Sequence, residues 1–269
     1  MKKYNYSVIS SELFDINYSN PKARIAIIGI SPGSSQSSEY KRTDTVKENN
    51  RRCAFSNGIT KKGQEKKSGM RTNLIKILNL IGVNNFLNIN SCETLWKEDY
   101  QKSLFTSILP YSVVRTKSEI DNEIKEEEYL EAKKEEYKKN NNNRIDGFFI
   151  SKISYEEIVN NENKKIKENF ESFKEVINEA RDSLEIMIAL GPTYDLLVKA
   201  IDAGEIHVNK KIIVHVPHPS NASAGAIKAF IAASEGKTLK KDATTQAKNG
   251  FELYTTAMEQ MNKAKAFLK

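Results

Sequence analysis

A loop of small residues follows an apolar run near the start of the chain. Residues 24–30 read RIAIIGI, and Gly29-Ile30-Ser31-Pro32-Gly33 fits the G-x-S-x-G pattern of a serine nucleophile elbow. The order Ser31, Asp195, His218 also matches the order of the triad in that class of hydrolase. The residue after the nucleophile must supply an oxyanion N–H, and Pro32 has none. We therefore do not expect a serine esterase.

Two other chemistries lack their essential residues. A phosphate-binding P-loop needs a lysine that the stretch after Gly29 does not contain. His215 and His218 have no accompanying cluster of Cys, Asp or Glu, and His215 is better read as a core or surface residue of its strand. With only Cys53 and Cys92, the chain has no zinc ribbon, iron–sulfur cluster or disulfide framework. We expect neither a metal nor a cofactor.

Strand and helix patterns alternate along the chain. Short apolar runs predict buried strands, and amphipathic or alanine-rich stretches predict helices between and after them. The predicted strands are 24–30, 103–110, 184–190 and 211–216, and the predicted helices are 70–81, 165–181, 192–201, 224–234 and 244–268. This alternation predicts an α/β fold of three layers, αβα, with a central, mostly parallel sheet.

A charged stretch interrupts this pattern. Residues 118–139 are dense in Glu and Lys and predict an exposed helix or a poorly packed segment, and 140–143 is a run of asparagines typical of a loop. We predict one domain, 1–269, with a charged helical insertion around 115–165. Ligands of such sheets bind at the carboxyl ends of the strands, so GISPG (29–33) and VPHPSNAS (216–223) should open onto one crevice.

Composition restricts the partner and the compartment. The formal net charge of +7 favours an acidic partner such as nucleic acid. The N-terminus lacks the apolar region of a signal peptide, and no apolar run approaches the length of a membrane span. We expect a cytoplasmic monomer that does not bind membranes.

An ordered set of motifs resembles the uracil-DNA glycosylase superfamily. The matching pieces are the strand that ends in Gly29-Ile30-Ser31-Pro32-Gly33, an aromatic at Phe55, and His218-Pro219-Ser220-Asn221-Ala222-Ser223 after the last strand. IALGPTYDLL (188–197) is similar to the penultimate strand and following helix of that superfamily, so the resemblance covers most of 24–235. It implies a cofactor-independent enzyme that flips a base out of DNA and hydrolyses its glycosidic bond.

The resemblance also implies residue roles. His218 would stabilise the departing base anion, and Phe55 would stack on the flipped base, with Ile30 and Ser107 also in the base pocket. The DNA backbone would be bound by the two loops, through Pro32, Gly33, Ser220, Asn221 and Ser223.

Three positions depart from the pattern of the superfamily. Ser31 stands where many members carry an Asp or Asn that activates or positions the attacking water. A serine can hold a water by hydrogen bonds but is no general base. Asp44 or Glu39 would then be the source of a carboxylate. Ser107 stands where an Asn reads uracil, and the wedge position is only Ala222. These small residues predict a roomy pocket and a modified or enlarged pyrimidine, such as those in phage DNA, which would give a role in defence. Housekeeping uracil repair and a non-catalytic DNA-binding homologue are the alternatives.

Overall fold

Four parallel strands form the central sheet of the computed structural model, which describes residues 5–10, 20–33, 55, 69–111, 113–116, 123–125, 150, 152–209 and 212–267. The order across the sheet is β3–β2–β6–β7, with β2 at Ile25–Gly29, β3 at Ser103–Ser107, β6 at Ile186–Leu190 and β7 at Ile213–Val216. Every residue of β2 and β6 is buried, as expected of continuous apolar strands that are covered on both faces.

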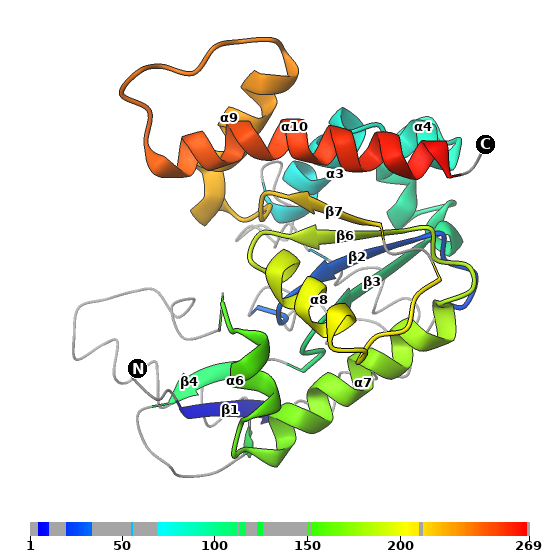
Figure 1. Cartoon of the computed structure of the whole chain (residues 1–269), viewed down its shortest axis with the longest axis vertical. Coiled ribbons are helices and arrows are strands. Elements are labelled where there is room, and N and C mark those ends of the chain that lie inside the picture. Colours follow the sequence, from blue (N-terminus) through cyan, green and yellow to red (C-terminus); the bar gives the residue numbers. More distant parts are fainter. Residues whose placement is uncertain are drawn as a thin grey trace, which may run out of the picture.

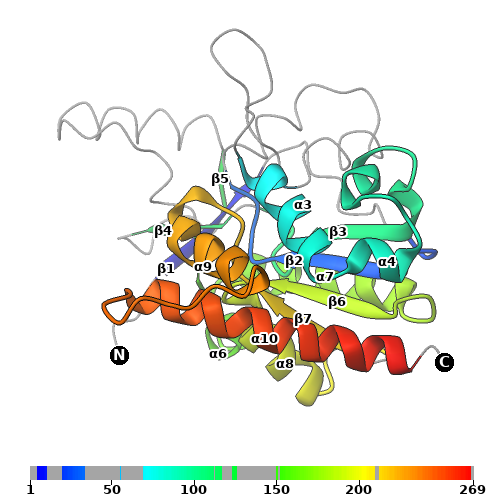
Figure 2. The ribbon, with the colours of Figure 1, turned by 90° about the horizontal axis from the view of Figure 1, so that it is seen from above.

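Helices cover both faces of this sheet (Figure 1). One face packs against α3 (Met70–Leu80), α4 (Val83–Leu87), α9 (Ala224–Ser234) and α10 (Thr245–Ala266), and Figure 2 looks onto this layer. The other face packs against α6 (Tyr155–Val159), α7 (Lys164–Ala180) and α8 (Thr193–Asp202). Within β2, Ile25 and Ile27 join the first core, and Ala26 and Ile28 join the second. The prediction of a three-layer α/β fold with a parallel sheet is confirmed.

The first turns of α10 pack directly on the start of α9. A Cβ atom at Gly250 of α10 would lie 2.2 Å from the carbonyl oxygen of Ala226, so only glycine allows this approach. Close by, the Gln246 amide donates a hydrogen bond to the carbonyl of Ala222 at 3.0 Å. The two helices are thus joined beside the loop that follows β7.

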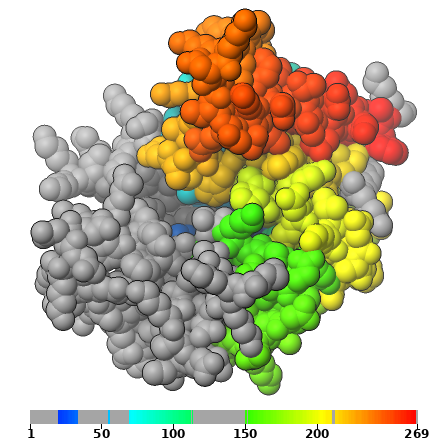
Figure 3. Space-filling model, turned by 60° about the vertical axis from the view of Figure 1, so that its left-hand side comes forward, coloured from blue at the N-terminus to red at the C-terminus, as the bar shows by residue number. Residues whose placement is uncertain are grey.

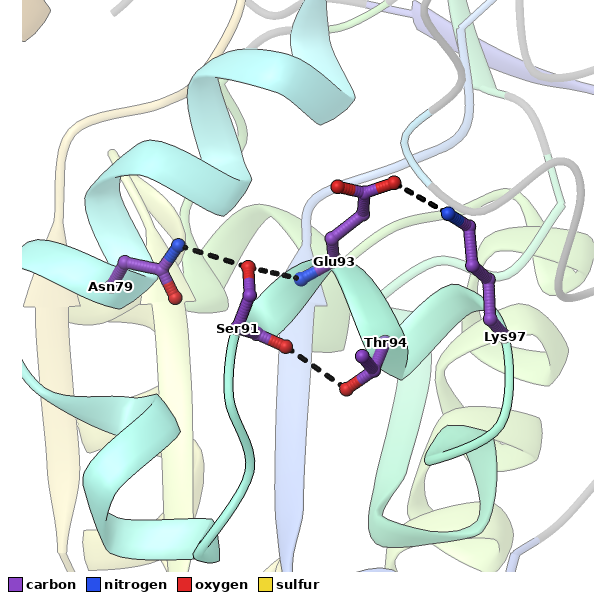
Figure 4. Close-up of polar contacts among 5 residues, drawn as sticks. All are labelled: Asn79, Ser91, Glu93, Thr94 and Lys97. Carbon is purple, nitrogen blue, oxygen red and sulfur yellow. Dashed lines mark hydrogen bonds and ion pairs between the residues drawn. The ribbon is translucent and has the colours of Figure 1, made fainter.

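A polar cluster fixes the connection that leads from α3 towards β3 (Figure 4). Asn79 in α3 donates to the Ser91 hydroxyl and accepts the backbone N–H of Cys92, at 3.3 and 2.8 Å. The same hydroxyl accepts the N–H of Glu93 at the start of the 3-10 helix η1 (Cys92–Trp96), and Thr94 donates to the Ser91 carbonyl. After η1, the 3-10 helix η2 (Tyr100–Lys102) leads into β3.

A second, small sheet was not predicted. It has the order β4–β1–β5, with β1 at Asn5–Ser10, β4 at Val113–Thr116 and β5 at Glu123–Lys125, and it lies on the side to which the strands of the central sheet point (Figure 1). β1 pairs antiparallel with β4 and parallel with β5. The expectation of a helix is therefore wrong at residues 123–125, because pairing with β1 outweighs the helix propensity of Glu and Lys. Residues 117–122, 126–149 and 151 of the predicted insertion lie outside the described residues.

Candidate functional site

The carboxyl ends of the four central strands form one edge. Gly29 pairs with Ser107, and Leu190 pairs with Val216, so the loops that follow all start at the same level. Beyond β3, the N–H groups of Ile108 and Leu109 donate to the carbonyls of Gly29 and Ile30, at 2.9 and 2.8 Å. The chain order of the strands reverses between β2 and β6, and such a switch point is where sheets of this type bind ligands.

This edge is hollowed in the space-filling view. Figure 3 looks from the side of the carboxyl ends and shows a few blue atoms of the segment 20–33 in a hollow. The segment that begins α9 borders it above, and residues coloured for the region of α6 border it on the right. Part of the segment 20–33, which contains β2 and the loop after it, is therefore visible from the face that the strands point to.

His218 follows β7 at this edge, and its imidazole is held in one tautomer and in the neutral form. The backbone N–H of Ser220 donates to Nδ1 of His218 at 3.3 Å. Burial lowers the pKa of His218 to about 4, so the ring is neutral at pH 7. Because Nδ1 accepts, the single proton is on Nε2, and no described residue accepts a hydrogen bond from it. His218 therefore presents a neutral N–H donor.

The loop that carries His218 is itself fixed. Asn73 in α3 donates to the carbonyl of Pro219 at 2.9 Å, and the N–H of Ser223 donates to the carbonyl of Ser220 at 3.0 Å. Ser220 and Ser223 are half-buried, whereas Asn221 is exposed in the 3-10 helix η3 (Asn221–Ser223), as is Ala222. The residues predicted to bind the DNA backbone on this side thus share one turn with His218.

Gly29, Ser107 and Phe55 meet at the end of β2. A Cβ atom at Gly29 would lie 3.5 Å from both the Phe55 ring and the Ser107 hydroxyl oxygen. Ser107 is 7% exposed, and its hydroxyl makes no hydrogen bond with another described residue. Phe55 is 4% exposed, contacts Phe105 edge to face at 6.1 Å, and has a φ of +50°, which is unusual for an aromatic residue. Phe55 is therefore a core aromatic here, next to the two small residues.

The hydroxyl of Ser31 joins two loops. It donates to the carbonyl of Tyr111 at 3.3 Å and accepts the N–H of Val113 at 3.0 Å. Asn169, buried in α7, holds the same segment by accepting the N–H of Tyr111 and donating to its carbonyl, at 2.8 and 3.2 Å. Ser31 thus ties the loop after β2 to the loop after β3, so its hydrogen and one lone pair are already used.

The other predicted residues of the first loop have different surroundings. Ile30 is 5% exposed and its side chain belongs to the core on the α7 and α8 face. Pro32 is buried and Gly33 is half-buried, directly after Ser31. Asp44 and Glu39 lie outside the described residues.

Three residues of this edge were missed by the sequence reasoning. Gly191 has a φ of +57°, and a Cβ atom there would lie 3.0 Å from Cβ of His218. Asn169 had a signal, because it is a polar residue three positions after Ile166 on the apolar face of α7. Asn73 had none, since nothing in its neighbourhood distinguishes it from a solvated helical residue.

The described part of the chain has neither a grouping of metal ligands nor a membrane-spanning helix. Within it, no three His, Cys, Asp or Glu side chains are grouped so that they could hold a metal ion. None of its helices is long and apolar enough to cross a membrane.

Comparison of the chain with protein-family models, with curated proteins and with solved structures gives no match.

Proposed function

We propose that the protein is a DNA glycosylase that hydrolyses the N-glycosidic bond of a base flipped out of DNA. In this reaction, water adds to the sugar carbon, and the base leaves with the electron pair of the broken bond and then takes up a proton. Negative charge develops on the oxygen atoms of the base. A donor aimed at that charge lowers the barrier, typically by a factor of about 10²–10³ in rate.

The neutral imidazole of His218 carries this proposal. A neutral donor gains interaction energy as the base becomes an anion, so it acts on the transition state more than on the bound substrate. The Ser220 N–H fixes the tautomer, and burial keeps the ring uncharged. The proposal assigns the leaving-group role to His218 and does not assign a general base.

The small residues beside β2 support an enlarged pyrimidine as the base. Serine at position 107 is shorter than the asparagine expected there, and a serine hydroxyl reads the base edge less strictly than an amide. Removal of bulky modified pyrimidines would suit defence against phage with modified DNA. Uracil repair is the alternative within the same chemistry.

The test of the proposal is the substitution His218→Ala. Base release from a duplex with one 5-hydroxymethyluracil should fall at least tenfold, with DNA affinity within about twofold. His207→Ala is the matched control, because His207 is exposed on the connection before β7, at the opposite edge, and should keep full activity. Unchanged release in His218→Ala would remove His218 from the mechanism.

The base preference is tested at Ser107. Single-turnover rates should be higher for 5-hydroxymethyluracil than for uracil in otherwise identical duplexes, and Ser107→Asn should shift the preference towards uracil. A wild-type protein that prefers uracil would refute the enlarged substrate and favour uracil repair.

One observation favours a second candidate, a DNA-binding protein without catalysis. Ser31 occupies the position expected to hold the attacking water, and its hydroxyl is engaged with the backbone of Tyr111 and Val113. This candidate predicts duplex binding with no base released from a panel of modified DNAs, measured by mass spectrometry of the free bases.

A further inference from the structure

His215, in the middle of β7, is held by neighbours from two helices. Its ring stacks on Tyr194 of α8 with centroids 4.5 Å apart and planes 5° from parallel. Its backbone N–H donates to the side-chain oxygen of Gln260 in α10 at 2.8 Å, and the amide of Gln260 reaches the Tyr194 hydroxyl at 3.4 Å. The ring position is therefore determined by α8 and α10 together.

The ring nitrogen of His215 binds the backbone of the loop after β6. Nε2 lies 2.9 Å from the carbonyl oxygen of Gly191. A carbonyl can only accept, so Nε2 carries a hydrogen. Burial lowers the pKa of His215, which makes the ring neutral near pH 7 with its proton on this nitrogen.

Gly191 in turn forms the surface on which His218 rests. Its φ of +57° and the 3.0 Å that would separate an added Cβ from Cβ of His218 show how closely the two residues approach. The Gly191 N–H donates to Val216 at 2.8 Å. Pro192 has no N–H, so the next peptide unit is held through the Gly191 carbonyl, which accepts from His215 and, at 3.3 Å, from the Tyr194 N–H.

We propose that His215 is a positioning residue, which fixes the Gly191 carbonyl and thereby the position of the His218 Cβ atom that carries the ring. This inference rests on the proposed function, since it concerns the same imidazole. A shift of about 1 Å in a group that acts on the transition state can reduce the rate by as much as ~10². His215 would thus influence base release without touching the base.

Two substitutions separate the hydrogen bond from the packing. His215→Phe keeps an aromatic ring on Tyr194 but has no donor for Gly191. His215→Gln places an amide N–H near the position of Nε2. With the 5-hydroxymethyluracil duplex, we expect His215→Phe to lower the single-turnover rate at least fivefold with affinity within about twofold, and His215→Gln to stay within about threefold of wild type.

A second readout does not depend on activity. The chain has three histidines, so ¹⁵N NMR can follow each ring after assignment by single substitutions. In the wild-type protein and in His215→Gln, Nδ1 of His218 should be unprotonated and Nε2 protonated at pH 7. In His215→Phe, the chemical shifts of the His218 ring nitrogens should change, because the Cβ atom that carries the ring moves.

Three results would overturn the inference. They are a wild-type rate in His215→Phe, unchanged His218 signals in that variant, or an equal loss of rate in both variants that follows their loss of thermal stability. If the wild-type protein releases no base from any duplex, the proposed function fails, and the His218 signals alone then decide the role of His215.

Discussion

The substitution Gly191→Ala tests whether the loop after β6 seats His218. An L-residue in the left-handed region costs about 1–2 kcal/mol, which applies because the φ of Gly191 is +57°. The new methyl carbon would also lie 3.0 Å from Cβ of His218, whereas carbon atoms prefer about 3.5–4.0 Å. Crowding of this kind costs about 1–3 kcal/mol more. We therefore expect the free energy of unfolding to fall by about 2–5 kcal/mol.

Gly204→Ala is the matched control. Its φ is +76°, but an added Cβ atom would have no neighbour within 4 Å, so only the backbone cost of about 1–2 kcal/mol applies. Urea unfolding measures both variants, and single-turnover base release should fall at least tenfold in Gly191→Ala alone. Equal destabilisation of the two variants, with wild-type base release in Gly191→Ala, would refute the contact between Gly191 and His218.

Four further outcomes are expected. The pKa of His218 is about 4 in the folded protein against about 6.5 in an unfolded chain, so base release should persist from pH 8 to about 5 and be lost as the pH falls through 4. Protonation of His218 then favours the unfolded state. The contribution of neutral His218 to the free energy of unfolding is at most roughly 3 kcal/mol; it is complete above pH 6.5 and is lost as the pH falls towards 4. The acid unfolding of His218→Gln should lack this loss. Asn169→Leu removes the amide that is bonded to the N–H and carbonyl of Tyr111. Because the carbonyl keeps the Ser31 hydroxyl, the free energy of unfolding should fall by about 1–3 kcal/mol in urea titrations. If lysines and arginines bind DNA phosphates, the logarithm of the affinity should fall with that of the salt concentration by about 0.9 per contact, and a flat titration would contradict this.

The layers and the parallel sheet could be predicted because one strong rule applies to them: a continuous apolar strand must be covered on both faces. Apolar runs such as IAIIG and IMIAL can bury both of their faces only if helices cover both sides of the sheet, and every residue of the two strands is buried. β5 depends on a partner, β1, that is more than a hundred residues away in the chain. Its Glu and Lys favour a helix locally, so no local rule predicts the strand.

The candidate site could be predicted only in part, for a similar reason. The position of His218 follows from the rule that loops after parallel strands meet at one edge. The engagement of Ser31 depends on the backbone of Val113, and the seat of His218 depends on the φ of Gly191. Such contacts depend on the positions of main-chain atoms, which cannot be predicted from the types of the residues.

The junction of α9 and α10 has a consequence for the order in which the molecule is assembled. The turn that carries His218 leads directly into α9, and the start of α9 is pressed against Gly250. Ala257, Met261 and Ala264 of α10 then cover the core on the β7 side of the sheet. During synthesis, every strand of the central sheet leaves the ribosome before this helix does. The nascent protein therefore exposes the part of this core beside β7 until α10 docks, and that docking also completes the support of the turn that holds His218.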